Sequence, residues 1–501
     1  MGLVRKKREM GMKELAGLLK TLSYEVLQGT VDGEVTSVAY DSRKVTEGGL
    51  FVCIKGTAVD GHSFAADVVE QGVSVLVVED PVEVPENVTL IRVEDTRLAL
   101  AEISAAYFDH PADTLKVIGI TGTKGKTTTT YMVKSILEST GAKVGLIGTI
   151  ETIIGQEHTP SAMTTPESYT IQESFRNMLE QGCEYAVMEV SSQGLMMNRV
   201  GGFTFEIGIF TNIEPDHIGP NEHASFEEYL ECKALLFQKC RLGIVNADDA
   251  HVQDIIKNAT CKIETYGISE QADLRADNIT LVHKPGYLGV AYDVEGLVNG
   301  PIEIDVPGRF SVYNSLTAIA ICHYFGVDLE KMQQALKVAK VKGRIEMIPV
   351  SNEFTLMIDY AHNAMALKSL LATLREYKPG RLVCVFGCGG NRSKIRRYEM
   401  GEVSGRLADL TIITSDNPRF EEPQAIIDDI KIGMAKTRGE YVEIINRKDA
   451  IKYAIANGEP GDVIVLAGKG HEDYQEIRGK KYPMDERVLI AEVLEELKEE
   501  K

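Results

Sequence analysis

The sequence predicts an α/β protein of three domains, and three observations lead to this fold class. The chain has 501 residues, which is too long for one hydrophobic core. From residue 115 onward, apolar runs typical of buried strands alternate with helix-like segments, as in parallel sheets with crossover helices. A glycine-rich phosphate-binding loop joins the first such strand to its helix. We expect a small α/β N-terminal domain at 1–113, a central P-loop domain with a parallel sheet at 114–342, and a Rossmann-like α/β C-terminal domain at 343–501.

The expected strands divide into three groups. The first part predicts strands at 35–40, 50–54 and 73–78, with a helix at 64–71. The central part predicts strands at 117–120, 144–147, 185–190, 207–211 and 242–246, followed by an antiparallel insertion at 279–306. The last part predicts strands at 355–359, 382–386, 410–414, 441–445 and 462–466. Ligands of parallel sheets bind at the carboxyl ends of the strands, so functional residues are expected there.

Composition excludes several classes of function. The formal net charge is −20, and no basic block with interleaved aromatic residues offsets it, so a nucleic-acid partner is not expected. No apolar run approaches the roughly 20 residues that span a bilayer, so membrane insertion is not expected either. The basic start at 1–8 lacks an apolar signal core. The eight cysteines are scattered, which favours reduced thiols. We expect a cytoplasmic monomer.

A glycine-rich loop follows the apolar run at 115–120. Residues 119–130 read Gly-Ile-Thr-Gly-Thr-Lys-Gly-Lys-Thr-Thr-Thr-Thr. Gly122 and Gly125 allow a tight turn whose amides face an anion. Lys126 can then reach the terminal phosphates, and Thr127 can hold Mg²⁺. The general pattern asks for glycine where Ile120 stands, so the loop is a variant. ATP is the first ligand that these residues predict.

Acid and imidazole side chains follow two of the central strands. Glu189 lies near the end of the strand at 185–190, and Asp216 and His217 lie just beyond the strand at 207–211. In a parallel sheet both strand ends point toward the phosphate loop. A carboxylate and an imidazole beside a triphosphate are suitable Mg²⁺ ligands, because the metal neutralises charge on the transferring phosphate.

Further motifs occur in order along the whole chain. They are Asp41-Ser-Arg43, Gly-Thr-Lys-Gly-Lys-Thr-Thr at 122–128, Glu189-Val-Ser-Ser-Gln-Gly-Leu, Thr211-Asn-Ile-Glu-Pro-Asp-His, Glu-Cys-Lys233-Ala-Leu-Leu-Phe, Gly308-Arg-Phe, Gly343-Arg-Ile-Glu346, Asp359-Tyr-Ala-His362, Phe386-Gly-Cys-Gly-Gly-Asn-Arg392, Asp416-Asn-Pro-Arg419 and Ala467-Gly-Lys-Gly-His-Glu472. This series resembles the successive signatures of the ATP-dependent Mur ligases. The resemblance covers essentially the whole sequence and all three expected domains.

The resemblance implies an amide ligase that uses ATP and Mg²⁺. Its substrates would be UDP-N-acetylmuramoyl-L-Ala-D-Glu and a diamino acid, joined during peptidoglycan precursor synthesis. The D-Glu carboxylate would attack the γ-phosphate of ATP to form an acyl phosphate. An amine of the incoming amino acid would then displace phosphate and form the amide. Within the family, the motif at 41–43 and the last two motifs favour addition of the third residue of the stem peptide.

The resemblance also assigns residues to roles. The catalytic residues would be Lys126, Glu189, His217 and Lys233. Metal ligands would be Thr127 and Glu189 for one ion, and His217 with a carbamylated Lys233 for a second. ATP would contact Gly122, Thr123, Lys124, Gly125, Lys126, Thr127, Thr128, Asn314, Arg344, Asp359 and His362. The UDP-substrate would contact Ser42 and Arg43 through its uridine nucleotide, and Thr164, Thr165, Ser191 and Arg199 through its muramoyl peptide. An unmodified Lys233 would instead be a charge partner for phosphate.

The incoming amino acid would bind in the last domain. The residues that resemble its pocket are Arg392, Asp416, Asn417, Pro418, Arg419, Gly468 and Glu472. This set resembles a pocket for meso-diaminopimelate, whose distal carboxylate suits a bidentate guanidinium from Arg419. Lysine lacks that carboxylate, so its distal ammonium would oppose Arg419. A buried site built for the carboxylate should therefore reject lysine.

Departures from the family pattern leave alternatives open. Asn363-Ala-Met follows His362, Glu214-Pro215 precedes Asp216, and Lys342 precedes Gly343, where the family commonly has other residues. A paralogue that uses L-lysine or a modified acceptor would explain them. A related amide ligase of the cyanophycin or folylpolyglutamate type is a second alternative. A non-catalytic ATP-binding scaffold or a P-loop kinase is a third, and a kinase would release a stable phosphorylated substrate.

Overall fold

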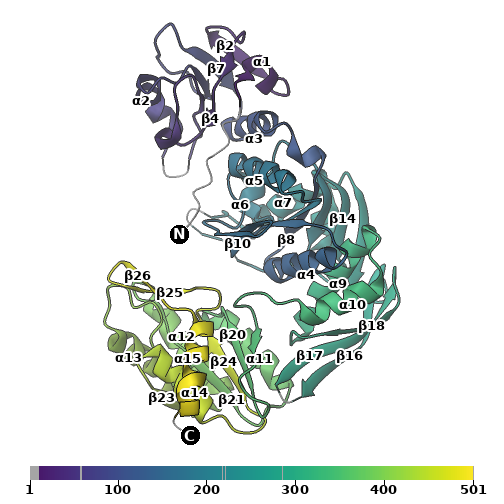
Figure 1. Cartoon of the computed structure of the whole chain (residues 1–501), viewed down its shortest axis with the longest axis vertical. Coiled ribbons are helices and arrows are strands. Elements are labelled where there is room, and N and C mark those ends of the chain that lie inside the picture. Colours follow the sequence, from purple (N-terminus) through teal and green to yellow (C-terminus); the bar gives the residue numbers. More distant parts are fainter. Residues whose placement is uncertain (1–10, 57–58, 217, 220–221, 285, 500–501) are drawn as a thin grey trace. The chain divides into compact units, whose positions relative to one another are not determined.

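The protein is an α/β protein with several largely parallel sheets. The computed structural model describes residues 11–56, 59–216, 218–219, 222–284 and 286–499 (Figure 1). The chain forms two compact units, which divide between Asp273 and Leu274. The domain boundaries expected at 113/114 and 342/343 fall inside these units and stay predictions. Among the described helices, none combines the length and the apolarity needed to cross a bilayer. All eight cysteines are free thiols.

The first unit begins with a small sheet in the order β2-β7-β6-β5-β4. Strands β4 to β7 are parallel neighbours, and β2 pairs with β7 in the antiparallel direction. Apolar residues on both faces of this sheet are buried against helices. The elements are β1 (Lys13–Glu14), α1 (Leu15–Leu18), β2 (Tyr24–Gln28), β3 (Glu34–Val35), β4 (Val38–Ala39), the 3₁₀ helix η1 (Ser42–Lys44), β5 (Leu50–Val52), η2 (Gly61–Phe64), α2 (Ala65–Glu70), β6 (Val75–Val78), β7 (Thr89–Val93), α3 (Thr96–Tyr107) and η3 (Pro111–Asp113).

The rest of the first unit is built on strands in the order β11-β10-β9-β12-β8-β13-β14-β15. The pairs from β9 to β15 are parallel, which confirms the predicted crossover arrangement. The elements are β8 (Lys116–Thr121), α4 (Lys126–Ser139), β9 (Val144–Ile147), β10 (Glu151–Ile154), β11 (Glu157–Pro160), α5 (Ser168–Glu180), β12 (Tyr185–Glu189), α6 (Ser192–Met196), β13 (Phe205–Phe210), α7 (Phe226–Ala234), η4 (Leu235–Gln238), β14 (Cys240–Asn246), α8 (Val252–Ile256) and β15 (Lys262–Gly267).

Helices cover both faces of these strands. Figure 1 shows α4 and α5 on opposite sides of β8 and β10. The face toward α5 carries a core of Phe175, Met188, Phe205 and other apolar residues. Because β12 lies between β8 and β9 in the sheet, the loops that follow these three strands meet at one edge. That edge carries the phosphate loop.

The second unit begins with antiparallel strands and two helices. Strands β16, β17 and β18 pair in that order, which confirms the predicted insertion, although it starts earlier than expected. The elements are β16 (Leu274–Lys284), β17 (Tyr287–Gly296), β18 (Gly300–Ile304), α9 (Arg309–Tyr324) and α10 (Leu329–Val338).

The C-terminal sheet has the order β19-β20-β24-β21-β22-β23, and its strands are parallel except for β19. Helices α14 and α15 pack their apolar residues on one face of the sheet, and α11, α12 and α13 lie on the other (Figure 1). The elements are β19 (Glu346–Ile348), β20 (Thr355–Asp359), α11 (Ala364–Glu376), β21 (Leu382–Phe386), α12 (Lys394–Leu407), β22 (Leu410–Ile413), α13 (Pro423–Met434), β23 (Glu440–Glu443), α14 (Arg447–Ala456), β24 (Val463–Ala467), β25 (Tyr474–Ile477), β26 (Lys480–Pro483) and α15 (Glu486–Glu499).

A partly buried carboxyl, that of Asp305, lies between β18 and α9. Burial raises the pKa of Asp305 to about 6, with Lys340 opposing the shift, and Oδ1 has no hydrogen-bond partner among the described residues. Ionising this buried carboxyl costs folding free energy, so the fold is most stable below the ordinary pKa of Asp305 and loses stability as the pH rises through 6. We expect Asp305→Asn to raise the unfolding midpoint by about 2 °C above pH 6, with the gain disappearing toward pH 4.

Thermal denaturation from pH 4 to pH 8 measures this effect. Asp254→Asn is the matched control, because the Asp254 side chain is 63% exposed. An equal gain in both variants, or a gain for Asp305→Asn that persists at pH 4, would contradict the interpretation.

Candidate active site

The residues that follow strand β13 fix the backbone of the phosphate loop. Gly122 has φ +150°, and a Cβ there would lie 1.9 Å from Thr211 Oγ1. Asn212 accepts a hydrogen bond from Thr123 N at its carbonyl and from Lys124 N at Oδ1, both 2.9 Å long. Gly125, with φ +87°, lies at the start of α4. The loop is therefore pre-shaped at a helix N-terminus, where backbone amides favour a phosphate. Sequence reasoning missed the part played by Asn212.

Two lysines meet at one carbonyl of this loop. Lys126 Nζ donates to Gly122 O at 2.7 Å and to Thr123 O at 3.1 Å. Lys233 Nζ donates to the same Gly122 O at 3.0 Å and lies 4.5 Å from the centre of the Tyr229 ring. Lys233 is only 1% exposed. Burial and, to a smaller extent, the charge of Lys126 hold the pKa of Lys233 well below its usual range. The lowered pKa favours the neutral, nucleophilic form of this amine.

Glu189 ends β12 as predicted and collects hydroxyl groups around its carboxylate. Thr127 Oγ1 donates to Oε2 at 3.0 Å. Thr149 donates from its N to Oε1 at 2.8 Å and from its Oγ1 to Oε2 at 3.0 Å. The carboxylate is 1% exposed. Gly148 leaves room for it, because a Cβ at 148 would lie 2.7 Å from Glu189 Oε1. Sequence reasoning missed Thr149, which lies two residues after β9 and reaches Glu189 because β9 and β12 are neighbours in the sheet.

These oxygen atoms fit a hard divalent cation. The carboxylate of Glu189 and the hydroxyl of Thr127 are ligands of the kind that Mg²⁺ takes. Among the described residues, no three His, Cys, Asp or Glu side chains gather as a metal site. His217 lies outside the described residues, so the second predicted ion, held by His217 and Lys233, stays a prediction. Lys124 Nζ pairs with Glu214 Oε2 at 2.6 Å, beside the loop.

The residues predicted to hold the muramoyl peptide gather around Glu189. Thr165 Oγ1 donates to Glu189 O at 3.0 Å and accepts from Ser191 N at 2.9 Å. Arg199 Nη1 donates to Thr165 O at 3.2 Å, and its Nε lies 2.9 Å from Glu167 Oε1. Thr164 Oγ1 lies 3.1 Å from Thr149 Oγ1. The structure thus brings these four predicted residues to the edge that holds the phosphate loop.

The predicted uridine-nucleotide residues have local partners. Ser42 and Arg43 lie in η1, which Asp41 caps by accepting from Arg43 N. The guanidinium of Arg43 donates to both carboxylate oxygens of Asp41, at 2.8 and 2.9 Å. Hydrogen bonding from Arg43 lowers the pKa of Asp41. The Arg43 side chain is 86% exposed, so it is accessible to an anionic ligand.

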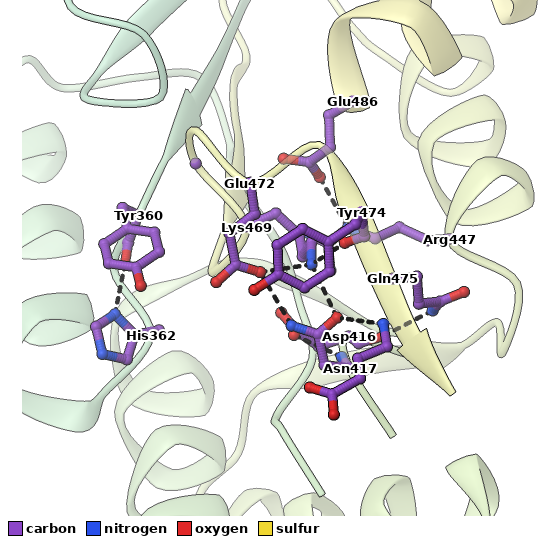
Figure 2. A network of polar contacts seen from close by, with 12 residues as sticks. Tyr360, His362, Asp416, Asn417, Arg447, Lys469, Glu472, Tyr474, Gln475 and Glu486 are labelled. Carbon is purple, nitrogen blue, oxygen red and sulfur yellow. Dashed lines mark hydrogen bonds and ion pairs between the residues drawn. The ribbon is translucent and has the colours of Figure 1, made fainter. Parts of the chain in front are cut away.

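In the second unit, predicted nucleotide residues lie around the aromatic ring of Tyr360. Arg344 lies over this ring at 4.9 Å, and the rings of His362 and His471 each lie 4.6 Å from it. Figure 2 shows Tyr360 with His362. Burial and the charge of Arg344 lower the pKa of His471 to about 4, so this imidazole is neutral.

The buried carboxylate of Asp359 organises the backbone beside this ring. It accepts hydrogen bonds from Ile345 N at 2.9 Å and from Ala361 N at 2.8 Å. Burial raises its pKa, although Arg344 opposes the shift. Asn314 is buried in α9. The structure brings Arg344, Asp359 and His362 together around Tyr360, and their contact with the nucleotide stays a prediction.

A buried lysine organises the predicted amino-acid pocket. Lys469 is 0% exposed, and its Nζ donates to Asn417 Oδ1 at 3.0 Å, to Glu472 Oε2 at 2.7 Å and to Tyr474 O at 2.5 Å. Asn417 Nδ2 also donates to Glu472 Oε2, at 2.9 Å. Figure 2 shows Lys469 between these side chains. Sequence reasoning missed Lys469, because a lysine between two glycines carries no signal of burial.

The remaining pocket residues lie around this cluster. Gly468, with φ +111°, passes close to Asp416, since a Cβ there would lie 3.1 Å from Asp416 Oδ2. Arg419 follows Pro418 and has φ +53°, and its Nε lies 3.0 Å from Glu476 Oε2. Arg392 is exposed. The structure therefore unites Asp416, Asn417, Gly468 and Glu472, with Arg419 linked through the β25 strand.

Three family models match successive segments of the chain. They are described as "Mur ligase family, catalytic domain" at 34–108, "Mur ligase middle domain" at 120–322, and "Mur ligase, glutamate ligase domain" at 343–470. Each matched segment lies within one of the three domains expected from the sequence. The expected boundaries themselves are not tested by these matches.

Curated relatives match along almost the whole chain. The UDP-N-acetylmuramoyl-L-alanyl-D-glutamate–2,6-diaminopimelate ligase 1 of Clostridium acetobutylicum is 44% identical over 97% of this chain and 100% of the relative. The corresponding ligase of Clostridium perfringens is 41% identical over 96% and 99%. A solved structure of a ligase with the same name is 29% identical, covers 97% of this chain and 99% of its own, and has a TM-score of 0.75. The chain belongs to the Mur ligase family.

Proposed function

We propose that this protein is an ATP-dependent ligase that adds meso-diaminopimelate to UDP-N-acetylmuramoyl-L-Ala-D-Glu in peptidoglycan precursor synthesis. The observation that carries this proposal is the set of polar contacts made by Asn417, Arg419 and Glu472, in a chain that matches diaminopimelate ligases from end to end. Two of the three substrates, ATP and the UDP-linked dipeptide, are nucleotides. We therefore infer that the reaction occurs in the cytoplasm. We take the active form to be a monomer.

The first step needs positive charge around the γ-phosphate. The amides of the loop at 122–128 and Lys126 would bind the phosphates, and Lys126 would exchange its two loop carbonyls for phosphate oxygens. Thr127 and Glu189 would hold Mg²⁺. The bound ion would neutralise negative charge on the phosphate that is transferred. The D-Glu carboxylate attacks phosphorus, ADP leaves, and an acyl phosphate forms.

Lys233 would act as a carbamate. A neutral amine can add CO₂, whereas a protonated one cannot, and burial lowers the pKa of this amine and so favours its neutral form. The carbamate would present two oxygens beside the phosphate loop, at a position that already touches Gly122 O. His217 would be its partner in holding a second cation.

The second step joins the amino acid. Its amine, after losing a proton, attacks the acyl carbon and expels phosphate, which forms the amide bond. Glu472, fixed by Lys469 and Asn417, would hold an amino group through its remaining oxygen. Arg419 would bind the distal carboxylate of meso-diaminopimelate in a charge-assisted pair.

Arg419→Ala is expected to raise the KM for meso-diaminopimelate by about 10²-fold, because a charge-assisted pair is lost and the substrate carboxylate is left without a partner. The KM values for ATP and for the UDP-substrate should stay within about twofold. Initial rates at varied amino acid measure this. Arg438→Ala is the control, since Arg438 lies outside the pocket motifs. An unchanged KM for meso-diaminopimelate would remove Arg419 from the pocket.

Phosphate release under omission of one substrate at a time tests the proposed function. The reaction contains ATP, Mg²⁺, UDP-N-acetylmuramoyl-L-Ala-D-Glu and meso-diaminopimelate. Rapid release that needs all of them supports ligation. Equal release with L-lysine in place of meso-diaminopimelate would support a paralogue, and formation of ADP without free phosphate would support a kinase. Absence of release under every condition would support an ATP-binding scaffold.

A further inference from the structure

The backbone of Arg419 is fixed by contacts with strand β25. Its φ of +53° is costly for a residue with a side chain, so neighbouring contacts must maintain it. Its backbone N donates to Glu476 O at 3.0 Å, and its carbonyl accepts from Arg478 N at 2.7 Å. These bonds make a parallel bridge between Arg419 and Ile477 of β25. Strand β25 therefore maintains the backbone conformation of Arg419.

Strand β25 is also hydrogen-bonded to the residues before Arg419. Gln475 Nε2 donates to Asp416 O at 2.7 Å, and Glu476 N donates to Asn417 Oδ1 at 2.8 Å. Figure 2 shows Gln475 beside Asp416 and Asn417. The strand and the motif at 416–419 thus form one rigid assembly in which side chains of β25 face the pocket motif.

The guanidinium of Arg419 is restrained at two of its three nitrogens. Nε donates to Glu476 Oε2 at 3.0 Å, and Nη1 donates to Gly390 O at 2.7 Å. Within the described part of the chain, Nη2 donates no hydrogen bond. A carboxylate that reaches Nη2 can also take the second hydrogen of Nη1, which is the two-point arrangement that guanidinium groups favour. The hydrogen bonds at Nε and Nη1 therefore set the direction in which the Nη1–Nη2 edge of the guanidinium points.

We propose that Glu476 is a positioning residue that orients the guanidinium of Arg419 for the distal carboxylate of the incoming amino acid, and that it thereby sets the preference for a substrate with that carboxylate. This inference rests on the proposed function. The Arg419 and Glu476 side chains are 23% and 24% exposed, and an ion pair of this exposure adds little to folding stability. Its effect should therefore appear in substrate binding and not in unfolding.

The kinetic test compares Glu476→Ala and Glu476→Gln with the unchanged protein. Glu476→Ala is expected to raise the KM for meso-diaminopimelate about tenfold, with kcat and the KM values for ATP and UDP-substrate within about twofold. Glu476→Gln should lose less, because its amide oxygen can still accept from Arg419 Nε. The matched control is Glu422→Gln. The Glu422 side chain is 79% exposed and lies 3.6 Å from Arg478, which is in the turn that follows β25.

A double-mutant cycle separates positioning from general support of the fold. In an Arg419→Ala background, Glu476→Ala should change the KM for meso-diaminopimelate by less than about twofold, because the residue through which Glu476 acts is gone. The same tenfold change in both backgrounds would overturn the inference, and so would a lower KM in Glu476→Ala alone, which would mean that its charge opposes the substrate. If the unchanged protein does not use meso-diaminopimelate, both the inference and the proposed function fail. If the unchanged protein uses meso-diaminopimelate and Glu476→Ala has the same KM for it, only the inference fails.

Discussion

Lys233→Ala is expected to lower phosphate release by about 10³-fold, and formate or acetate at millimolar concentration is expected to restore part of it. The reason is the position of the amine, which is buried and lies 3.0 Å from Gly122 O, and whose pKa is lowered by that burial. The carbamate that we propose there would be lost with the side chain, and a small carboxylate can enter the space with similar oxygens. Phosphate release measured at varied carboxylate gives the result.

Lys239→Ala is the matched control for this prediction, since Lys239 follows η4 in the same region and is assigned no role. Depleting CO₂ and bicarbonate should also lower the activity of the unchanged protein but not that of Lys233→Ala. Full activity of Lys233→Ala would remove this lysine from the reaction. A loss that no carboxylate repairs, with no effect of CO₂, would favour a direct contact between its amine and phosphate.

Glu189→Gln is expected to reduce turnover by about 10³-fold while leaving the fold intact. The amide keeps the size of the carboxylate and can still accept from Thr127 Oγ1, but it removes the negative charge that would hold Mg²⁺. Higher Mg²⁺ should recover part of the activity by mass action. Steady-state rates across Mg²⁺ concentrations, together with thermal denaturation, distinguish loss of metal from loss of structure.

Glu184→Gln provides the comparison for Glu189, because Glu184 directly precedes β12 at the other end of the strand and is exposed. Its activity should match that of the unchanged protein. Equal rates for Glu189→Gln and the unchanged protein at low Mg²⁺ would show that Glu189 does not hold the metal.

Most of the parallel core could be predicted from its apolar runs. The bounds of β9, β20 and β21 match the expected ranges, because each is a short run buried on both faces. Strand β2 was missed, because Tyr24–Gln28 lies at a sheet edge and is only partly buried. Strand β11 was missed, because all four of its residues are exposed and carry no apolar pattern.

Site residues with a motif could be predicted, whereas those defined by distant contacts could not. The phosphate loop carries its chemistry in consecutive residues, so Lys126 and Thr127 can be proposed directly from the sequence. Thr149 reaches Glu189 only because β9 and β12 are neighbours, and sheet order is absent from the sequence. Glu476 reaches Arg419 across 57 positions through a hairpin that the strand pattern did not reveal. Such contacts follow from the fold and not from local composition.

The most direct test of this account is the mass of the UDP-linked product formed with equal amounts of meso-diaminopimelate and L-lysine, together with ATP, Mg²⁺ and UDP-N-acetylmuramoyl-L-Ala-D-Glu. We expect a product that carries diaminopimelate through an amide bond, formed with one phosphate released per product. A product that carries lysine, or a phosphorylated substrate without an added amino acid, would contradict the account.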